Sequence, residues 1–212
     1  AYDTVWDAFT GSWHAAADIY RQAYRTLLQP GLKKVAENEA LPDWYRRDMP
    51  LVITYPVRGR HDMDTMEPNA LFPYENVLPI VEELEKRTGA RIMVLLMHWE
   101  GTAPWAPPYV WPPFGGEAMF SAFRDKLHAR GDLLGVYCSG FGFTEQSNLI
   151  GSYNCEEAIR SRRLDSGFCL SPEQTLPHSR ICTGQRSGYD ICAASAVGRT
   201  ILDEALAPLW KS

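Results

Sequence analysis

Residues 91–97 read RIMVLLM, a run in which six consecutive apolar side chains follow one arginine. The segments LVITY at 51–55 and LLGVY at 133–137 repeat this short, mostly apolar pattern. A run without polar alternation predicts a strand that is buried on both faces, as is typical of a parallel sheet. We therefore expect three parallel strands.

Two helix-length segments separate these strands. Within residues 77–84 and 119–127, apolar side chains recur with the spacing of an amphipathic helix. The predicted order is therefore strand, helix, strand, helix, strand, which is typical of α/β folds.

The connections between these elements are unequal in length. Each helix reaches its next strand through a tight turn, at 88–90 and 130–132, but the strands are followed by long segments at 57–74, 99–115 and 139–152. Such connections usually have about 2–6 residues. Because α/β sheets and barrels build their sites at the carboxyl ends of the strands, the long loops predict which face carries the site.

The chain has no clear fourth strand, and a closed eight-stranded barrel typically needs about 250 residues. We predict an α/β fold, a partial (β/α)₈ TIM-type barrel, in which residues 51–212 supply the N-terminal portion and the barrel continues beyond the chain. Residues 1–50 form a helix capped by Ser12 and a connector. A smaller open sheet is the alternative. Unpaired strand edges predict that the segment is not stable by itself.

Composition excludes several classes of function. The net charge is −5 and the sequence pI is about 5.6, so nucleic acid is not expected as a partner. No apolar run reaches the roughly 18 residues of a membrane span. The chain begins at Ala1, so any signal peptide would precede it and localisation stays open. The five cysteines form no CxxC pair, and we expect structural or free thiols rather than a disulfide framework.

The stretch HWEGTAPWAPPYVWPPFGG at 98–116 is highly specific. It resembles a largely uncharacterised family of glycoside hydrolase-like (β/α)₈-barrel proteins, DUF6259. The segments GVYCSG at 135–140 and RICTGQRSGYDIC at 180–192 are similar to later parts of that family, and GSWHAA at 11–16 is similar to the helix that precedes its barrel. The resemblance covers nearly the whole chain.

The resemblance implies a glycoside hydrolase region that binds a carbohydrate substrate at the carboxyl-end face of the barrel. It also implies partners within the same polypeptide, namely the remainder of the barrel and an upstream β-sandwich domain. Related hydrolases carry their acidic pair at the ends of later strands, and an Asp-bearing strand is expected just beyond Ser212. At least one catalytic carboxylate would then lie outside this chain.

Two glutamates are the candidate catalytic acids. His98 and Glu100 close the second strand, and a spacing of two places both side chains on the same side of an extended backbone. Glu100 can transfer a proton, accept hydrogen bonds from sugar hydroxyls, or brace a loop. Glu145, in the loop after the third strand, is the second candidate, and its alternative is a solvated surface glutamate.

Aromatic side chains interleave with prolines in the loop after the second strand, in a pattern that suits sugar-ring stacking. The alternative is a small aromatic core beneath the loop. These candidate binding residues are Trp99, Trp105, Tyr109 and Trp111.

The remaining substrate-binding candidates follow the strands or lie in the glycine-containing segment at 180–192, and they are Tyr55, Arg58, His98, Tyr137, Ser139, Arg186, Tyr189 and Asp190. The Arg186 guanidinium can donate two hydrogen bonds to a carboxylate or to vicinal oxygens, or it can form an ion pair with Asp190. A polar cluster of His61, Asp62 and Asp64 matches no specific metal-ligand spacing. We predict neither a metal nor a cofactor, because no nucleotide-binding signature occurs in a strand-to-helix context.

Three functions compete at this point. The leading hypothesis is acid/base glycosidic cleavage by paired carboxylates. The rival is a non-catalytic carbohydrate-binding or structural domain derived from the same fold. The third is a barrel enzyme with a metal near His61 or His98.

Overall fold

The structure is a computed structural model that describes residues 6, 8–27, 31–59, 67–101, 110–138, 142–147, 154–178 and 186–211. It divides the chain into two compact units, Ala1–Met49 and Pro50–Ser212. Each unit is described by itself. Within the described residues, no helix combines the length and the apolarity that crossing a membrane requires.

The first unit is mostly helical. Helix α1 (Trp13–Leu27) begins after Ser12, whose carbonyl oxygen accepts a hydrogen bond from the Ala15 amide. A 3-10 turn, η1 (Val35–Glu37), and the short helix α2 (Asp43–Arg47) follow. The rings of Trp13 and Tyr20 are exposed on α1. The predicted helix and connector are therefore present.

The second unit contains the predicted parallel sheet. Strands β1 (Leu51–Pro56), β2 (Ile92–Met97) and β3 (Leu133–Val136) pair in the order β1-β2-β3, with Leu95 opposite Thr54 on one side and Gly135 on the other. The three apolar runs of the sequence therefore correspond to the three strands of this sheet.

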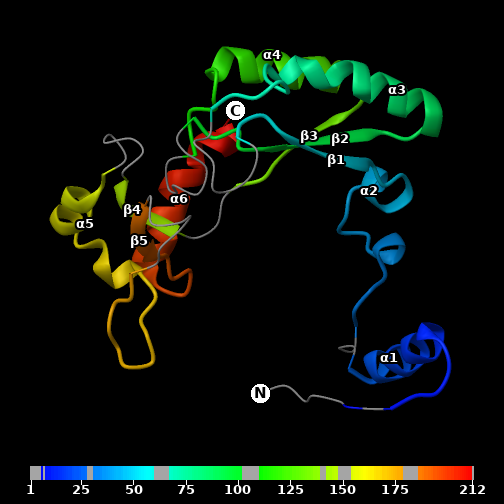
Figure 1. Ribbon diagram of the computed structural model, residues 1–212, viewed down its shortest axis with the longest axis horizontal. Coiled ribbons are helices and arrows are strands. Elements are labelled where there is room, and N and C mark those ends of the chain that lie inside the picture. Colours follow the sequence, from blue (N-terminus) through cyan, green and yellow to red (C-terminus); the bar gives the residue numbers. More distant parts are fainter. Residues whose placement is uncertain are drawn as a thin grey trace. The chain divides into compact units, whose positions relative to one another are not determined.

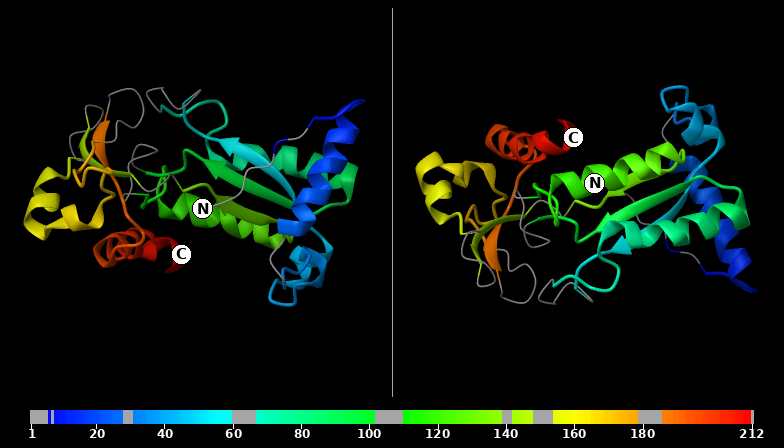
Figure 2. Two further views of the ribbon diagram at one scale, coloured as in Figure 1. Left: turned by 90° about the horizontal axis from the view of Figure 1, so that it is seen from below. Right: turned by 90° about the horizontal axis from the view of Figure 1, so that it is seen from above.

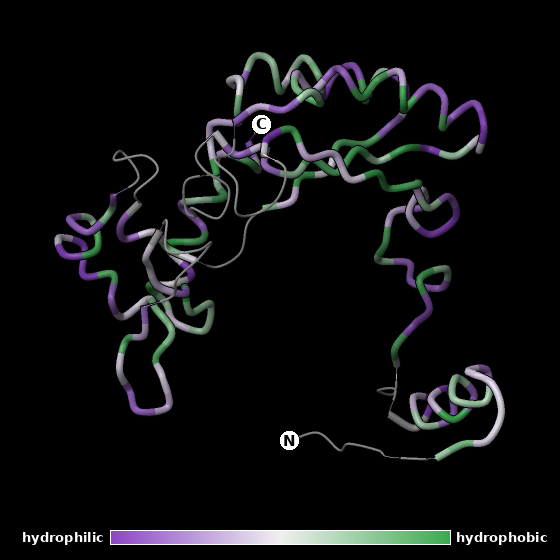
Figure 3. The backbone as a smooth tube through the Cα atoms, viewed as in Figure 1, coloured by the Kyte–Doolittle hydropathy of each residue, from purple (hydrophilic) through white to green (hydrophobic). Residues whose placement is uncertain are grey.

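Two helices lie side by side across one face of this sheet (Figures 1 and 2). Helix α3 (Leu78–Thr88) follows the 3-10 turn η2 (Tyr74–Val77), and α4 (Glu117–Ala129) precedes β3. Polar and apolar segments alternate along both helices in Figure 3, as expected for amphipathic helices. The sheet and its helices form a mixed α/β layer.

The amino ends of the strands are held by short connections. Gly89 ends α3 with φ at 65°, a left-handed conformation that glycine adopts without steric cost. At the other turn, the buried Asp132 carboxylate accepts a hydrogen bond from the Ile92 amide at 3.0 Å, which ties β3 to β2. Arg130 pairs with Asp132 and also with Glu82 and Glu85 of α3.

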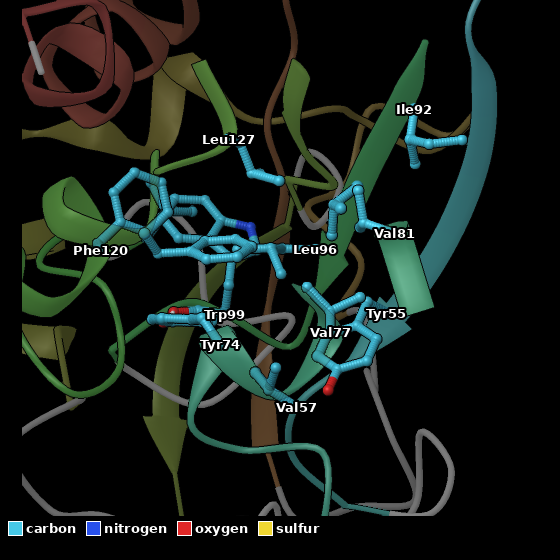
Figure 4. Packing of buried hydrophobic residues seen from close by; sticks show 13 residues of the cluster. Tyr55, Val57, Tyr74, Val77, Val81, Ile92, Leu96, Trp99, Phe120 and Leu127 are labelled. Carbon is cyan, nitrogen blue, oxygen red and sulfur yellow. Dashed lines mark hydrogen bonds between the residues drawn. The ribbon is translucent and has the colours of Figure 1, made fainter. Parts of the chain in front are cut away.

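The first of two apolar cores lies between the sheet and the two helices. Residues Ile92, Val94 and Leu96 of β2 are fully buried and alternate with half-buried neighbours. Figure 4 shows the Trp99 side chain among those of Tyr74, Phe120 and Leu96. This core brings the loop after β2 into the same packing as the helices.

The remaining elements correct two expectations. Residues 139–152 and 180–192 were expected as loops, but strands β4 (Gly142–Ser147) and β5 (Arg186–Asp190) occur within them and pair antiparallel. Because Gly188 has no side chain, the backbones approach closely, and a Cβ there would stand 2.0 Å from the Phe143 carbonyl oxygen. The pairing joins segments more than forty residues apart, which local patterns do not reveal.

Three further elements pack on this second sheet. They are α5 (Glu156–Arg162), the 3-10 turn η4 (Leu164–Gly167) and α6 (Ala196–Lys211). Their apolar residues form a second core with both strands, consisting of Phe143, Cys155, Leu164, Phe168, Ile191 and Ile201.

We predict that the isolated 212-residue chain unfolds in a broad, weakly cooperative transition. Val52 lies on an outer strand and is 50% exposed, and the chain consists of two compact units rather than one. Circular dichroism and tryptophan fluorescence during urea unfolding would measure the transition. Coincident, steep transitions by both probes would contradict the prediction.

Candidate functional site

The carboxyl ends of β1 and β2 are joined by a buried arginine. Arg58 follows β1, and its guanidinium Nη1 donates a hydrogen bond to the Glu100 carbonyl oxygen at 2.8 Å. The same guanidinium lies over the Phe114 ring, 4.3 Å from the ring centre. A buried cation is costly unless it is paired, so these contacts hold the two strand ends together.

His98 ends β2 in an unusual conformation. Its φ angle is 57°, in the left-handed region that residues other than glycine rarely adopt. The His98 Nδ1 lies 2.8 Å from the Arg58 carbonyl oxygen, and because that oxygen can only accept, Nδ1 carries the proton. The backbone is therefore not extended through His98, which corrects the reason for expecting its side chain beside that of Glu100.

The loop after β2 folds back on itself. Glu100 forms an antiparallel bridge with Pro113, and the Gly101 amide donates to the Pro112 carbonyl oxygen at 2.8 Å. A Cβ on Gly101 would stand 2.0 Å from that oxygen, so this position requires glycine. Glu100 is only 1% exposed as a result.

The Glu100 carboxylate acts electrostatically on two neighbours. Burial raises the pKa of Tyr74, with Glu100 raising it further and Arg58 lowering it. Burial and the Glu100 charge raise the pKa of the Cys138 thiol, just after β3, to about 11. The ends of all three strands thus contribute to one polar group, buried except for the half-buried Cys138, which we call the strand-end cluster and define as Arg58, Tyr74, His98, Glu100 and Cys138.

Two of the predicted binding aromatics are core residues. Trp99 has no exposed surface, and its indole N–H donates to the Tyr137 carbonyl oxygen at 2.9 Å. Tyr55 is buried, and its hydroxyl donates to the Leu71 carbonyl oxygen at 2.8 Å. Neither ring presents a face to solvent, so in both positions the small-core alternative describes what the structure shows.

Other aromatics are more accessible. Tyr137 is exposed, and Trp111 is half-buried with its indole N–H donating to the Glu117 carboxylate at 2.6 Å. Trp111 also lines a cavity of about 240 Å³, whose other residues are Phe143, Ala158, Arg162, Ile201, Glu204, Ala205 and Pro208. The Arg162 and Glu204 side chains form an ion pair at 2.7 Å beside this largely apolar lining.

Glu145 belongs to a second polar group. It lies at an irregularity between Thr144 and Gln146 in β4, where the register shifts. Its side chain is 16% exposed, with one carboxylate oxygen 2.8 Å from His178 Nε2 and the other accepting a 3.1 Å hydrogen bond from the Tyr189 hydroxyl. We call Glu145, His178 and Tyr189 the Glu145 cluster.

Ring stacking holds the Glu145 cluster in place. The Tyr189 ring stacks between those of His178 and Phe168, at centre-to-centre distances of 4.8 and 4.9 Å. Burial and the hydrogen bond to Glu145 raise the pKa of Tyr189. His178 was not predicted, because it lies 33 residues from Glu145 in a segment without periodicity. Glu145 itself is held on two sides, unlike a solvated surface glutamate.

Several predicted residues are not brought into either cluster. Asp190 is exposed, and Arg186 lies in β5 with a side chain outside the description. Trp105, Tyr109, Ser139, His61, Asp62 and Asp64 lie outside the described residues. Among the side chains that are described, no group of three or more His, Cys, Asp or Glu is arranged to hold a metal ion.

Comparison with protein families matches residues 1–175 to a domain of unknown function, DUF6259. The chain belongs to the DUF6259 family. Comparison with the curated proteins finds no match.

Solved structures similar to this DUF6259 chain include α-N-acetylgalactosaminidase NagBb from Bifidobacterium bifidum. Its Gal-NHAc-DNJ complex aligns with a TM-score of 0.61, 16% identity and coverage of 93% of this chain and 30% of that chain. The quadruple mutant aligns with a TM-score of 0.59, also at 16% identity, covering 93% of this chain and 31% of that one. At this identity the likeness is one of fold, and this chain spans under a third of the neighbour's length. The parallel sheet and its helices therefore resemble part of a glycoside hydrolase.

We predict that Trp99→Ala lowers the free energy of unfolding of the full-length protein by about 3–5 kcal/mol, because it empties a buried ring site and removes a hydrogen bond. The control Leu170→Ala changes an exposed side chain away from α1 and should stay within about 0.5 kcal/mol. Denaturant unfolding followed by circular dichroism measures both values. A Trp99→Ala protein as stable as the control would contradict the assignment of Trp99 to the core.

Proposed function

We propose that this chain is the N-terminal portion of a (β/α)₈ TIM-type barrel that binds a glycan at the carboxyl ends of its strands and cleaves a glycosidic bond. The observation that carries the proposal is the asymmetry of the β1-β2-β3 sheet. Polar side chains follow all three strands and long connections follow β1 and β2, whereas tight turns precede β2 and β3. The similarity in fold to a glycoside hydrolase also supports a glycan site at the carboxyl ends of the strands.

The outer strands support continuation of the barrel. In the part of the chain that the structure describes, β1 and β3 are the outer strands of the parallel sheet, and Val52 is exposed on β1. A parallel strand is normally covered on both sides. The partners we propose for these edges are the remaining strands of the barrel in the same polypeptide. An upstream β-sandwich is the proposed partner for the exposed rings of α1.

Glu145 is the catalytic candidate that the described geometry favours. Its carboxylate retains access to solvent, and His178 and Tyr189 orient both oxygens. A carboxyl group placed in this way can deliver a proton to the glycosidic oxygen as the leaving group departs. The second carboxylate of the pair would come from outside this chain.

Glu100 has a different proposed role. It was expected as an acid, but its 1% exposure leaves no room for a sugar at its carboxylate. Within the strand-end cluster, its backbone carbonyl receives Arg58 and its charge acts on Cys138. We therefore assign Glu100 a structural role beneath the proposed site. Trp111 and Tyr137 are the accessible rings for sugar contact.

The alternative is a carbohydrate-binding domain without catalysis. The burial of Glu100 favours this alternative. Among the described residues at the strand ends of the parallel sheet, aromatic rings are accessible but no acidic side chain is. Glycan binding by the full-length protein without turnover would select this alternative.

We predict that Glu145→Gln lowers kcat of the full-length protein by about 10²–10⁴-fold, because the amide cannot donate the proton. The substrates are 4-nitrophenyl α- and β-glycosides, beginning with the α-N-acetylgalactosaminide that the NagBb name suggests. Glu173→Gln is the matched control, since this exposed glutamate follows Ser171 in a surface turn. An active wild type with unchanged kcat in Glu145→Gln would contradict the role of Glu145.

A further inference from the structure

Two cysteines lie on the same face of a short antiparallel pairing. Phe168 and Ile191 form an isolated bridge, flanked by hydrogen bonds from the Cys169 amide to Asp190 at 2.7 Å and from the Cys192 amide to Gly167 at 2.8 Å. Because side chains alternate across a strand, both cysteines lie on the face opposite to Phe168 and Ile191. Those two apolar side chains are buried, so the thiols lie on the outer face.

The two thiols are neighbours. The Cys169 and Cys192 side chains shift the pKa of each other's thiol, and both are free thiols. Cys169 is exposed and Cys192 is partly exposed, whereas Cys155 is buried in the second core. A reagent in solution therefore reaches this pair and not Cys155.

The local backbone makes the two thiols unequal. Backbone hydrogen bonding by Ala194 and Ser195 lowers the pKa of the Cys192 thiol, and the Arg199 charge acts in the same direction. Partial desolvation and the neighbouring Cys192 raise the pKa of Cys169. At neutral pH Cys192 thus holds more thiolate, which is the reactive form.

The position of Cys192 is fixed by the start of α6. The Ser195 hydroxyl accepts a hydrogen bond from the Gly198 amide at 2.8 Å and so caps the helix. A Cβ on Gly198 would stand 2.1 Å from the Cys192 carbonyl oxygen, so the helix packs directly against this residue. The Cys192 backbone is therefore held against the first turn of α6.

We propose that Cys169 and Cys192 form a reversible disulfide by exchange with a low-molecular-weight disulfide such as oxidised glutathione. The Cys192 thiolate attacks one sulfur of that disulfide and releases a thiolate. The Cys169 thiol then loses its proton and attacks the Cys192 sulfur of the mixed disulfide, releasing the second thiolate. Two protein thiols are oxidised, and one small disulfide is reduced to two thiols.

The disulfide would constrain the Glu145 cluster. Residues 170–191 lie between the two cysteines and carry both His178 and Tyr189, which contact Glu145. Closing this loop reduces the conformational freedom of the segment that presents them. The cross-link itself rests on the shared outer face of the bridge and on the closeness of the two thiols, and it does not depend on the proposed glycan chemistry.

Peptide mapping tests the proposal on the full chain. The protein is equilibrated in glutathione buffers from reducing to oxidising, and free thiols are then blocked with iodoacetamide before digestion and mass spectrometry. We expect one cross-linked peptide pair containing Cys169 and Cys192, lighter by two hydrogen atoms, which reductant converts into two alkylated peptides. Cys155 should remain a thiol in the folded protein.

Variants separate the proposed pair from other pairings. Cys182→Ser, a change outside the described residues, should leave the cross-link intact. Cys169→Ser should trap Cys192 as a mixed disulfide with glutathione. In the reduced protein, Cys192 should react with iodoacetamide several-fold faster than Cys169.

Two results would overturn the proposal. One is alkylation of both Cys169 and Cys192 in the oxidising buffer while circular dichroism shows a folded protein. The other is a cross-link from Cys192 or Cys169 to Cys182. Equal alkylation rates of the two reduced thiols would contradict Cys192 as the attacking group.

Discussion

The hydrogen bond from the buried Arg58 guanidinium to the Glu100 carbonyl oxygen is the contact on which the carboxyl end of the sheet depends. A cation removed from water must be held by acceptors and by an aromatic face, and Glu100 and Phe114 supply them. The two groups come from both arms of the folded-back loop. That loop delivers Trp99 to the core and Trp111 to a half-buried position beside it.

The two polar groups differ in their access to solvent. The strand-end cluster is buried except for the half-buried Cys138, and its hydrogen bonds join the connections that follow neighbouring strands. The Glu145 cluster keeps part of its carboxylate in contact with solvent and is oriented by a histidine and a tyrosine from a distant segment. The Glu145 cluster therefore supplies an oriented carboxylate in contact with solvent, whereas the Glu100 carboxylate of the strand-end cluster is closed to it.

The sequence predicted the parallel sheet well, because continuous apolar runs such as residues 92–97 are typical of parallel strands. It predicted α3 and α4 because each buries one apolar stripe. It did not predict β4 and β5, since their pairing depends on Gly188 approaching Phe143 across a long separation. Nor could it distinguish a sugar platform from a core for Trp99, because the decision rests on the Tyr137 carbonyl that receives its indole. His178 was missed for the same reason, as its role comes only from contact with Glu145.

A crystal structure of the full-length protein with a bound glycan tests the central claim most directly. The account predicts a sugar at the carboxyl ends of β1, β2 and β3, above the strand-end cluster and beside Trp111 or Tyr137, with further strands paired to β1 and β3. A sugar bound at the amino ends, near Arg130 and Asp132, or outer strands left uncovered in the full-length protein, would contradict it.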